Sequence, residues 1–114
     1  MSHAIAANPH ACVTAALRAA RSVVAKWIGR PNAAKRLAGL ANVSARTPER
    51  WLTGTIDPDL EACLTLIAND PDARAAYAAE LATIFRALDA AETARRAKHE
   101  ADGKDILLDR QRNV

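Results

Sequence analysis

The stretch from Ala33 to Gly54, AAKRLAGLANVSARTPERWLTG, predicts two short helices joined by a tight turn. Asn32 precedes the first helix as an expected N-cap, because its side-chain oxygen can accept a hydrogen bond from a free N–H group at the helix start. Small and apolar residues recur at threes and fours along this helix and form one stripe: Ala34, Leu37, Ala38 and Ala41. Such a narrow stripe lets another helix approach closely.

The turn between the two helices is Ala41 to Ser44. A sharp reversal needs a residue with positive φ, and asparagine adopts it most readily after glycine, so Asn42 is expected there. Ser44 is expected to cap the second helix and Gly54 to end it. Pro48 falls within or just past the first turn of that helix, where it removes at most one hydrogen bond.

The segment from Ala33 to Ile67 resembles the helix-turn-helix of the Cro/C1 repressor-like class, in particular the small phage and prophage regulators. The likeness rests on a small-residue helix, a turn, the pattern S-x-x-T-x-x-x-W-L-x-G and a following P-x-L helix. Two positions depart from the pattern: Asn42 replaces the usual glycine, and Pro48 replaces a β-branched residue. The resemblance implies that the second helix enters the major groove of duplex DNA while the first lies across the backbone.

The resemblance also selects candidate contact residues. Three residues of the second helix are expected to read bases: Arg46, Thr47 and Arg50. Arg46 is the best candidate for a bidentate contact, because a guanidinium group matches O6 and N7 of guanine. Six residues are expected to contact the DNA backbone without reading its sequence: Arg30, Asn32, Lys35, Arg36, Ser44 and Thr53.

The net charge of +3 hides an uneven distribution. From Arg18 to Arg50 there are eight Lys or Arg residues and one acid, a net charge of +7. From Trp51 to Ala94 there are two basic and eight acidic residues, a net charge of −6. The basic segment is therefore centred on the predicted motif, where binding would require phosphate neutralisation.

The whole chain predicts an all-α fold, a compact four- to five-helix bundle with a long C-terminal helix. Its 114 residues include 28 alanines, which favour helix but give a thin core. We expect a flexible N-terminal arm over residues 1–11, a DNA-binding core over 12–70, and a C-terminal helix and tail over 71–114. The thin core favours support from a partner subunit.

A first helix is predicted from Cys12 to Gly29, with one apolar face formed by Val13, Leu17, Ala20, Val24, Trp27 and Ile28. Trp27 completes this face, so it is expected in the core rather than as a stacking platform. The basic residues elsewhere on the helix are Arg18, Arg21 and Lys26. They could contact phosphates or form an ordinary solvated face, and the sequence leaves both open.

Two Asp-Pro pairs predict helix starts, with Asp57 and Asp70 as N-caps. The helix after the first pair is expected to run to about Ala68 and to bury three apolar residues: Leu60, Leu64 and Ile67. The sequence leaves open whether Cys63 is buried with them. The helix after the second pair is expected to reach about Ala101 and to be broken at Gly103.

The long C-terminal helix has apolar positions spaced by four and three: Tyr77, Leu81, Ile84, Leu88 and Ala91. This heptad-like spacing suits a helix pair. We expect its first half to join the core, and an exposed part around Phe85 and Leu88 to form a homodimer contact. The cluster from Ile106 to Leu108 is expected to be a short docking segment or a frayed tail.

The sequence carries no pattern typical of catalysis. The three histidines lie in tails or at a helix end, and no cysteine or carboxylate stands at zinc-ligand spacing. Cys12 and Cys63 are expected to be reduced core thiols. There is no signal-peptide pattern and no apolar run near the roughly 18–20 residues that span a membrane. We therefore expect no enzyme, metal, cofactor or membrane contact, and a cytoplasmic, nucleoid-associated location.

These features predict a sequence-specific, double-stranded DNA-binding transcriptional regulator of phage type, either repressor or activator, acting as a homodimer. The alternative is a helical protein-interaction module, such as an antitoxin or adaptor, that works through the C-terminal helix. In that case the acidic segment from Trp51 to Ala94 would suit a basic partner.

Overall fold

The computed structural model describes residues 8 to 112, with side chains described as far as Gly103. It contains five helices, α2 (Ala11–Trp27), α3 (Ala33–Ala41), α4 (Arg46–Leu52), α5 (Leu60–Asn69) and α6 (Pro71–Arg112). The described residues contain no strand, so the predicted all-α class is confirmed. The expected N-terminal arm lies largely outside the described residues.

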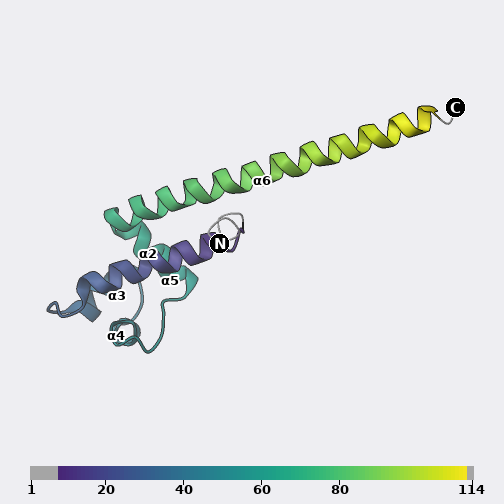
Figure 1. Cartoon of the computed structure of the whole chain (residues 1–114). Coiled ribbons are helices and arrows are strands. Elements are labelled where there is room, and N and C mark those ends of the chain that lie inside the picture. Colours follow the sequence, from purple (N-terminus) through teal and green to yellow (C-terminus); the bar gives the residue numbers. More distant parts are fainter. Residues whose placement is uncertain (1–7, 113–114) are drawn as a thin grey trace.

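Helix α2 is the centre of the fold. Helices α5 and α6 both pack along it, and α3 packs against α4 and α5 (Figure 1). In Figure 1, α6 runs along one side of α2 and α4 lies on the other. The main core therefore forms where α2, α3 and α5 meet, around Val23, Leu37 and Leu66, none of which is exposed.

The long C-terminal helix is confirmed, but the molecule is less compact than predicted. Its extents are 80 × 25 × 22 Å and its radius of gyration is 21.8 Å. A compact domain of this length has a radius of about 13 Å. The difference comes from α6, which starts against α2 and then continues far beyond the other helices (Figure 1).

The predicted break at Gly103 is wrong, because α6 continues to Arg112. Gly103 is not among the glycines with positive φ, which are Gly29 and Gly54. A single glycine in a helix costs only about 1 kcal/mol relative to alanine, so flanking helix formers can carry the helix through it. The side chains of the predicted cluster from Ile106 to Leu108 lie outside the described part.

The buried face of α2 differs from the predicted one. It consists mainly of alanines, with two valines at its C-terminal end: Ala11, Ala15, Ala16, Ala19, Ala20, Val23 and Val24. Val13 is 41% exposed and Ile28, which follows the helix, is 60% exposed, so their predicted burial is wrong. Helices α5 and α6 both pack along α2, and small alanine side chains on its buried face let them approach closely.

The start and the buried face of α5 also differ from the prediction. Asp59, not Asp57, caps the helix, and its Oδ1 accepts the N–H of Ala62 at 2.8 Å. Leu60 and Leu64 are 49% and 42% exposed, so their predicted burial is wrong. The buried face instead carries Ala62, Cys63, Leu66 and Ile67. The predicted burial of Ile67 is therefore confirmed, and Cys63 is buried with it.

The second Asp-Pro pair behaves as predicted. Asp70 precedes α6, and its Oδ1 accepts the N–H groups of Asp72 at 3.0 Å and Ala73 at 3.1 Å. At the first pair, by contrast, the Asp57 carboxylate is bound by Arg21 instead of capping a helix. The helix therefore starts two residues later than predicted, after Asp59, whose extended backbone suits an N-cap.

Helix α6 uses its predicted apolar stripe against α2. Ile84 is buried with Ala11 and Ala15, and Tyr77 and Leu88 pack against this small cluster. Phe85 is 50% exposed on another side of the helix. From Glu92 to Asp102 every residue is exposed. No helix within the described range is long and apolar enough to cross a membrane.

Candidate nucleic-acid interface

The turn between α3 and α4 has the predicted left-handed residue. Asn42 ends α3 with φ 58° and ψ 48°, and Val43 donates its N–H to the carbonyl of Ala38 at 3.1 Å. Val43 also packs partly buried against the main core. The turn therefore fixes the angle between the two helices by both backbone geometry and packing.

Asn32 lies at the predicted N-cap position of α3 but does not cap it through its side chain. Its backbone is left-handed, with φ 58° and ψ 28°, and the side chain makes no cap hydrogen bond. A capping side chain normally needs an extended backbone at this position. Asn32 instead serves the reversal between α2 and α3, since asparagine tolerates the left-handed region.

The expected cap by Ser44 is wrong. Helix α4 begins at Arg46, its N-cap position is Ala45, and no side chain caps it. The carbonyl of Ser44 accepts the N–H of Thr47 at 3.2 Å, while its side chain is exposed. Pro48 lies in the first turn as predicted, where N–H groups have no partner inside the helix, so its missing donor costs little.

Helix α4 is anchored on one side and open on the other. Pro48 and Trp51 are buried, whereas Arg46 and Arg50 are exposed and Thr47 is half-buried. Residues four apart share one face of a helix, so the two arginines project together. The geometry therefore presents two of the three predicted base-reading residues, Arg46 and Arg50, on the outer side of α4, whereas Thr47 is half-buried.

The end of α4 uses Thr53 internally. Its hydroxyl lies 3.1 Å from the carbonyl oxygen of Arg50 and 2.8 Å from the hydroxyl of Thr55. A hydroxyl has one proton to donate, and either of these bonds can use the proton of Thr53. Thr53 is exposed, but in this geometry it has no spare donor for a phosphate oxygen.

The three basic residues of α2 are bound to acidic groups. Arg18 pairs with Glu80, and Arg21 binds both carboxylate oxygens of Asp57 at 2.6 and 3.0 Å. The hydrogen bond from Arg21 lowers the pKa of Asp57, and Asp57 in turn raises the pKa of Arg21.

Lys26 lies between two carboxylates at the start of α6. Its Nζ is 3.0 Å from Asp70 and 3.3 Å from Asp72. The hydrogen bond to Asp70 raises the pKa of Lys26. The acidic segment therefore neutralises the α2 cations, which leaves them poorly suited to the phosphate contact that the sequence had left open.

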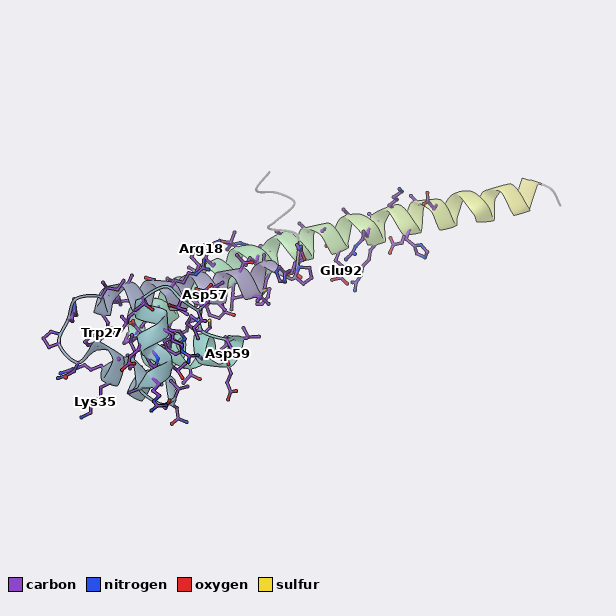
Figure 2. All side chains as sticks on the ribbon, turned by 90° about the horizontal axis from the view of Figure 1, so that it is seen from below. Arg18, Trp27, Lys35, Asp57, Asp59 and Glu92 are labelled. Carbon is purple, nitrogen blue, oxygen red and sulfur yellow. The ribbon has the colours of Figure 1, made fainter. Side chains whose placement is uncertain are left out.

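Five basic residues remain on the segment from Arg30 to Arg50. None of them makes an ion pair within the described residues, and all are exposed: Arg30, Lys35, Arg36, Arg46 and Arg50. One acid, the exposed Glu49, lies in the same segment. Figure 2 shows Lys35 at the end of the molecule opposite to the free end of α6. Four basic residues of α6 also make no ion pair within the described residues, but they stand among the acids of that helix: Arg74, Arg86, Arg95 and Lys98. Unpaired positive charge with little acid beside it is therefore found on α3, α4 and the turn before α3.

The contacts of Trp27 with two arginines were not predicted from the sequence. The ring packs partly buried against the main core, as predicted, but it also carries two arginines. The Cζ atoms of Arg30 and Arg36 lie 5.4 and 5.5 Å from its centroid, within the range of cation–π attraction. The spacing Trp27-x-x-Arg30 around a helix end was a visible signal for the first of these contacts.

The other chemical groups are few. Cys63 is buried and donates to the carbonyl of Pro58, and its burial raises the pKa of the thiol. Within the described part of the chain no three His, Cys, Asp or Glu side chains are grouped for metal binding.

Comparisons with protein-family models, with curated proteins and with solved structures find no match.

Proposed function

We propose that this chain is a sequence-specific, double-stranded DNA-binding regulator that places α4 in the major groove. The observation that carries the proposal is that the basic residues from Arg18 to Arg50 divide into an ion-paired group on α2 and an unpaired group after it. The cations of α2 are paired with acids, while those of α3, α4 and the turn before α3 have no such partner among the described residues. Cations available to release counterions from DNA are the electrostatic signature of a nucleic-acid interface.

In this proposal Arg46 and Arg50 reach base edges from the exposed side of α4. Pro48 and Trp51 hold the opposite side against the protein, so the reading side chains project from a fixed support. Arg30, Lys35 and Arg36 contact phosphates and set the position of the protein on the duplex.

We further propose that the regulator acts as a homodimer through α6, with Phe85 in the contact. The apolar side chains around Ile84 are already used against α2, but Phe85 is not. A two-fold dimer would place two α4 helices on half-sites about one helical turn of DNA apart.

A second candidate function is binding of a protein partner through α6. The observation in its favour is the exposed run from Glu92 to Asp102 on a helix that continues well beyond the core. Removal of residues 95–114 separates the two functions. A DNA regulator keeps its DNA binding after this truncation, whereas an interaction module loses its partner.

The test of the main proposal is selection from a pool of random duplex DNA at about 150 mM salt, followed by sequencing of the retained molecules. We expect an enriched palindromic sequence with half-sites about 10 base pairs apart. Retention that shows no enriched sequence and weakens as salt rises would mean that the basic surface binds DNA without sequence specificity. That result would favour the protein-interaction function.

A further inference from the structure

Trp27 stands where α2 ends and the basic segment begins. Arg30 reaches its ring from the turn before α3, and Arg36 reaches it from the first turn of α3. Figure 2 shows Trp27 at the same end of the molecule as Lys35. One half-buried aromatic side chain thus holds two exposed guanidinium groups that have no carboxylate partner in the described structure.

Two hollows flank the ring, and their charges differ. The larger, about 560 Å³, contains Arg30 but is also lined by Asp70 and Asp72. The smaller, about 350 Å³, is lined only by Trp27, Arg36, Gly39 and Leu40. Lys26 also lines the larger hollow and is bound to both of these carboxylates. The larger hollow therefore holds two cations and two acids, whereas the smaller one holds Arg36 and no acid, so the smaller one is the better place for a phosphate.

The lining of the smaller hollow fits the chemistry of a nucleic-acid backbone. Arg36 offers a planar group that can bind phosphate oxygens in pairs. Trp27, Leu40 and the bare surface of Gly39 offer an apolar floor for a sugar ring. A guanidinium group already stacked on an aromatic ring also loses less freedom when it binds, which favours affinity.

We propose that Trp27, Arg30 and Arg36 form a clamp for the DNA backbone. Arg36 binds a phosphate at the hollow between Trp27, Arg36, Gly39 and Leu40, and Arg30, which does not line this hollow, adds positive charge from the same ring. This inference rests on the proposed DNA binding and adds Trp27 as a positioning residue. Trp27 acts through the two arginines by fixing their head groups.

Gly39 allows a direct test of where the phosphate lies. It is exposed in α3, and a Cβ atom added there would meet nothing within 4 Å, so a longer side chain fits without disturbing the core. Gly39→Glu places an acid in the hollow, and Gly39→Gln places a neutral side chain of the same shape there. We expect the Glu variant to bind the selected duplex roughly tenfold more weakly than the Gln variant.

Trp27 is tested by a matched pair of substitutions. Trp27→Leu removes the ring, and we expect roughly a three- to tenfold loss of affinity for the selected duplex. Trp27→Phe keeps an aromatic face and should stay within about threefold of the original chain. Circular dichroism is the control that tests whether both variants keep their helices.

A measurement on the unmodified chain complements these variants. Its two tryptophans give two indole N–H signals in a ¹⁵N-correlated spectrum, and Trp27→Phe identifies which belongs to Trp27. On titration with the selected duplex, we expect the Trp27 signal to shift. Trp51 lies on α4 next to Arg50, so its signal reports DNA binding whether or not the clamp forms.

The outcomes separate this inference from the function on which it rests. If the chain binds the duplex but the Trp27 signal is unmoved and Gly39→Glu binds like Gly39→Gln, the clamp is wrong and the DNA-binding function stands. If the unmodified chain retains no duplex from the pool, the proposed function fails and the clamp fails with it.

Discussion

The Nζ atom of Lys26, near the end of α2, lies 3.0 Å from Oδ2 of Asp70, the residue that caps α6. Asp70 is only 9% exposed, and it binds Lys26 while it also accepts two backbone N–H groups of α6. One carboxylate therefore joins the central helix to the start of the longest one.

Two substitutions at Asp70 separate its roles. Asp70→Ala removes both the cap and the ion pair, and loss of a cap alone costs about 0.5–2 kcal/mol. Asp70→Asn keeps a capping side chain and removes only the charge. We expect the Ala variant to lower the free energy of unfolding more than the Asn variant, as measured by urea unfolding followed at 222 nm. Equal losses in the two variants would show that the cap contributes nothing.

Stability should fall in acid because of Asp57 and Asp70. Burial alone would raise the pKa of Asp70, but the N–H of Ala73 and the ammonium group of Lys26 outweigh it, so its pKa is lowered. The hydrogen bond from Arg21 lowers the pKa of Asp57. A lowered folded-state pKa gives stability that is complete above the unfolded-state value of about 3.9 and is lost as the pH falls below it.

Urea midpoints measured between pH 6 and pH 2.5 test this dependence. At pH values below about 4, the urea concentration at the midpoint should fall. It should fall less steeply with pH in Asp57→Asn and Asp70→Asn, which no longer titrate at these positions. Asp89→Asn, on the exposed side of α6, is the control and should follow the original chain. A pH profile that neither variant flattens would contradict the assignment.

The helical class and the turn could be predicted from the sequence, because they depend on local properties. Asn42 was identified since few residues other than glycine tolerate a positive φ. The buried faces of α2 and α5 could not be predicted in the same way. Large apolar residues such as Leu60 and Val13 dominate a hydrophobic pattern, yet they are exposed, and many of the buried positions of the two helices are instead alanines or Cys63.

The candidate interface was predictable in outline only. Sequence separates basic from acidic segments, but it does not show that Arg21 reaches Asp57, 36 residues away, or that Lys26 reaches Asp70. Those long-range pairs decide which cations remain available. The position of Arg36 over Trp27 likewise depends on the reversal at Asn32, which is a property of the folded chain.

The turn before α4 gives a prediction about Asn42 and Ser44. Asn42→Val forces a β-branched residue into the left-handed region and should cost about 1–2 kcal/mol of stability. Asn42→Gly should be nearly neutral because glycine adopts this geometry freely. Ser44→Ala should change stability by less than about 0.5 kcal/mol, since its exposed side chain caps nothing. Urea unfolding measures the free energy of unfolding of all three variants. A large loss of this free energy in Ser44→Ala would show that Ser44 does cap α4.

The proposed dimer is tested at Phe85. Phe85→Glu places a charge on a side chain that is half exposed and outside the core, so the helices should persist while self-association is lost. Light scattering at tens of micromolar should give a dimer mass for the original chain and a monomer mass for this variant. Ala90→Glu lies about 140° further around α6 and should remain a dimer. A monomer mass for the original chain at this concentration would remove the dimer from the proposal.

The roles of α3 and α4 are separated by Arg46 and Lys35. If Arg46 reads a base, Arg46→Ala should reduce the preference for the selected duplex over random duplex by about 1–3 kcal/mol. If Lys35 contacts a phosphate, Lys35→Ala should weaken both duplexes alike and lower the slope of log affinity against log salt by about one unit. Arg86→Ala, an exposed arginine on α6, controls for the loss of a charge. Fluorescence anisotropy at several salt concentrations gives both quantities. Equal losses on selected and random duplex for Arg46→Ala would mean that Arg46 contacts the backbone, and α4 would then lose its role as the reading helix.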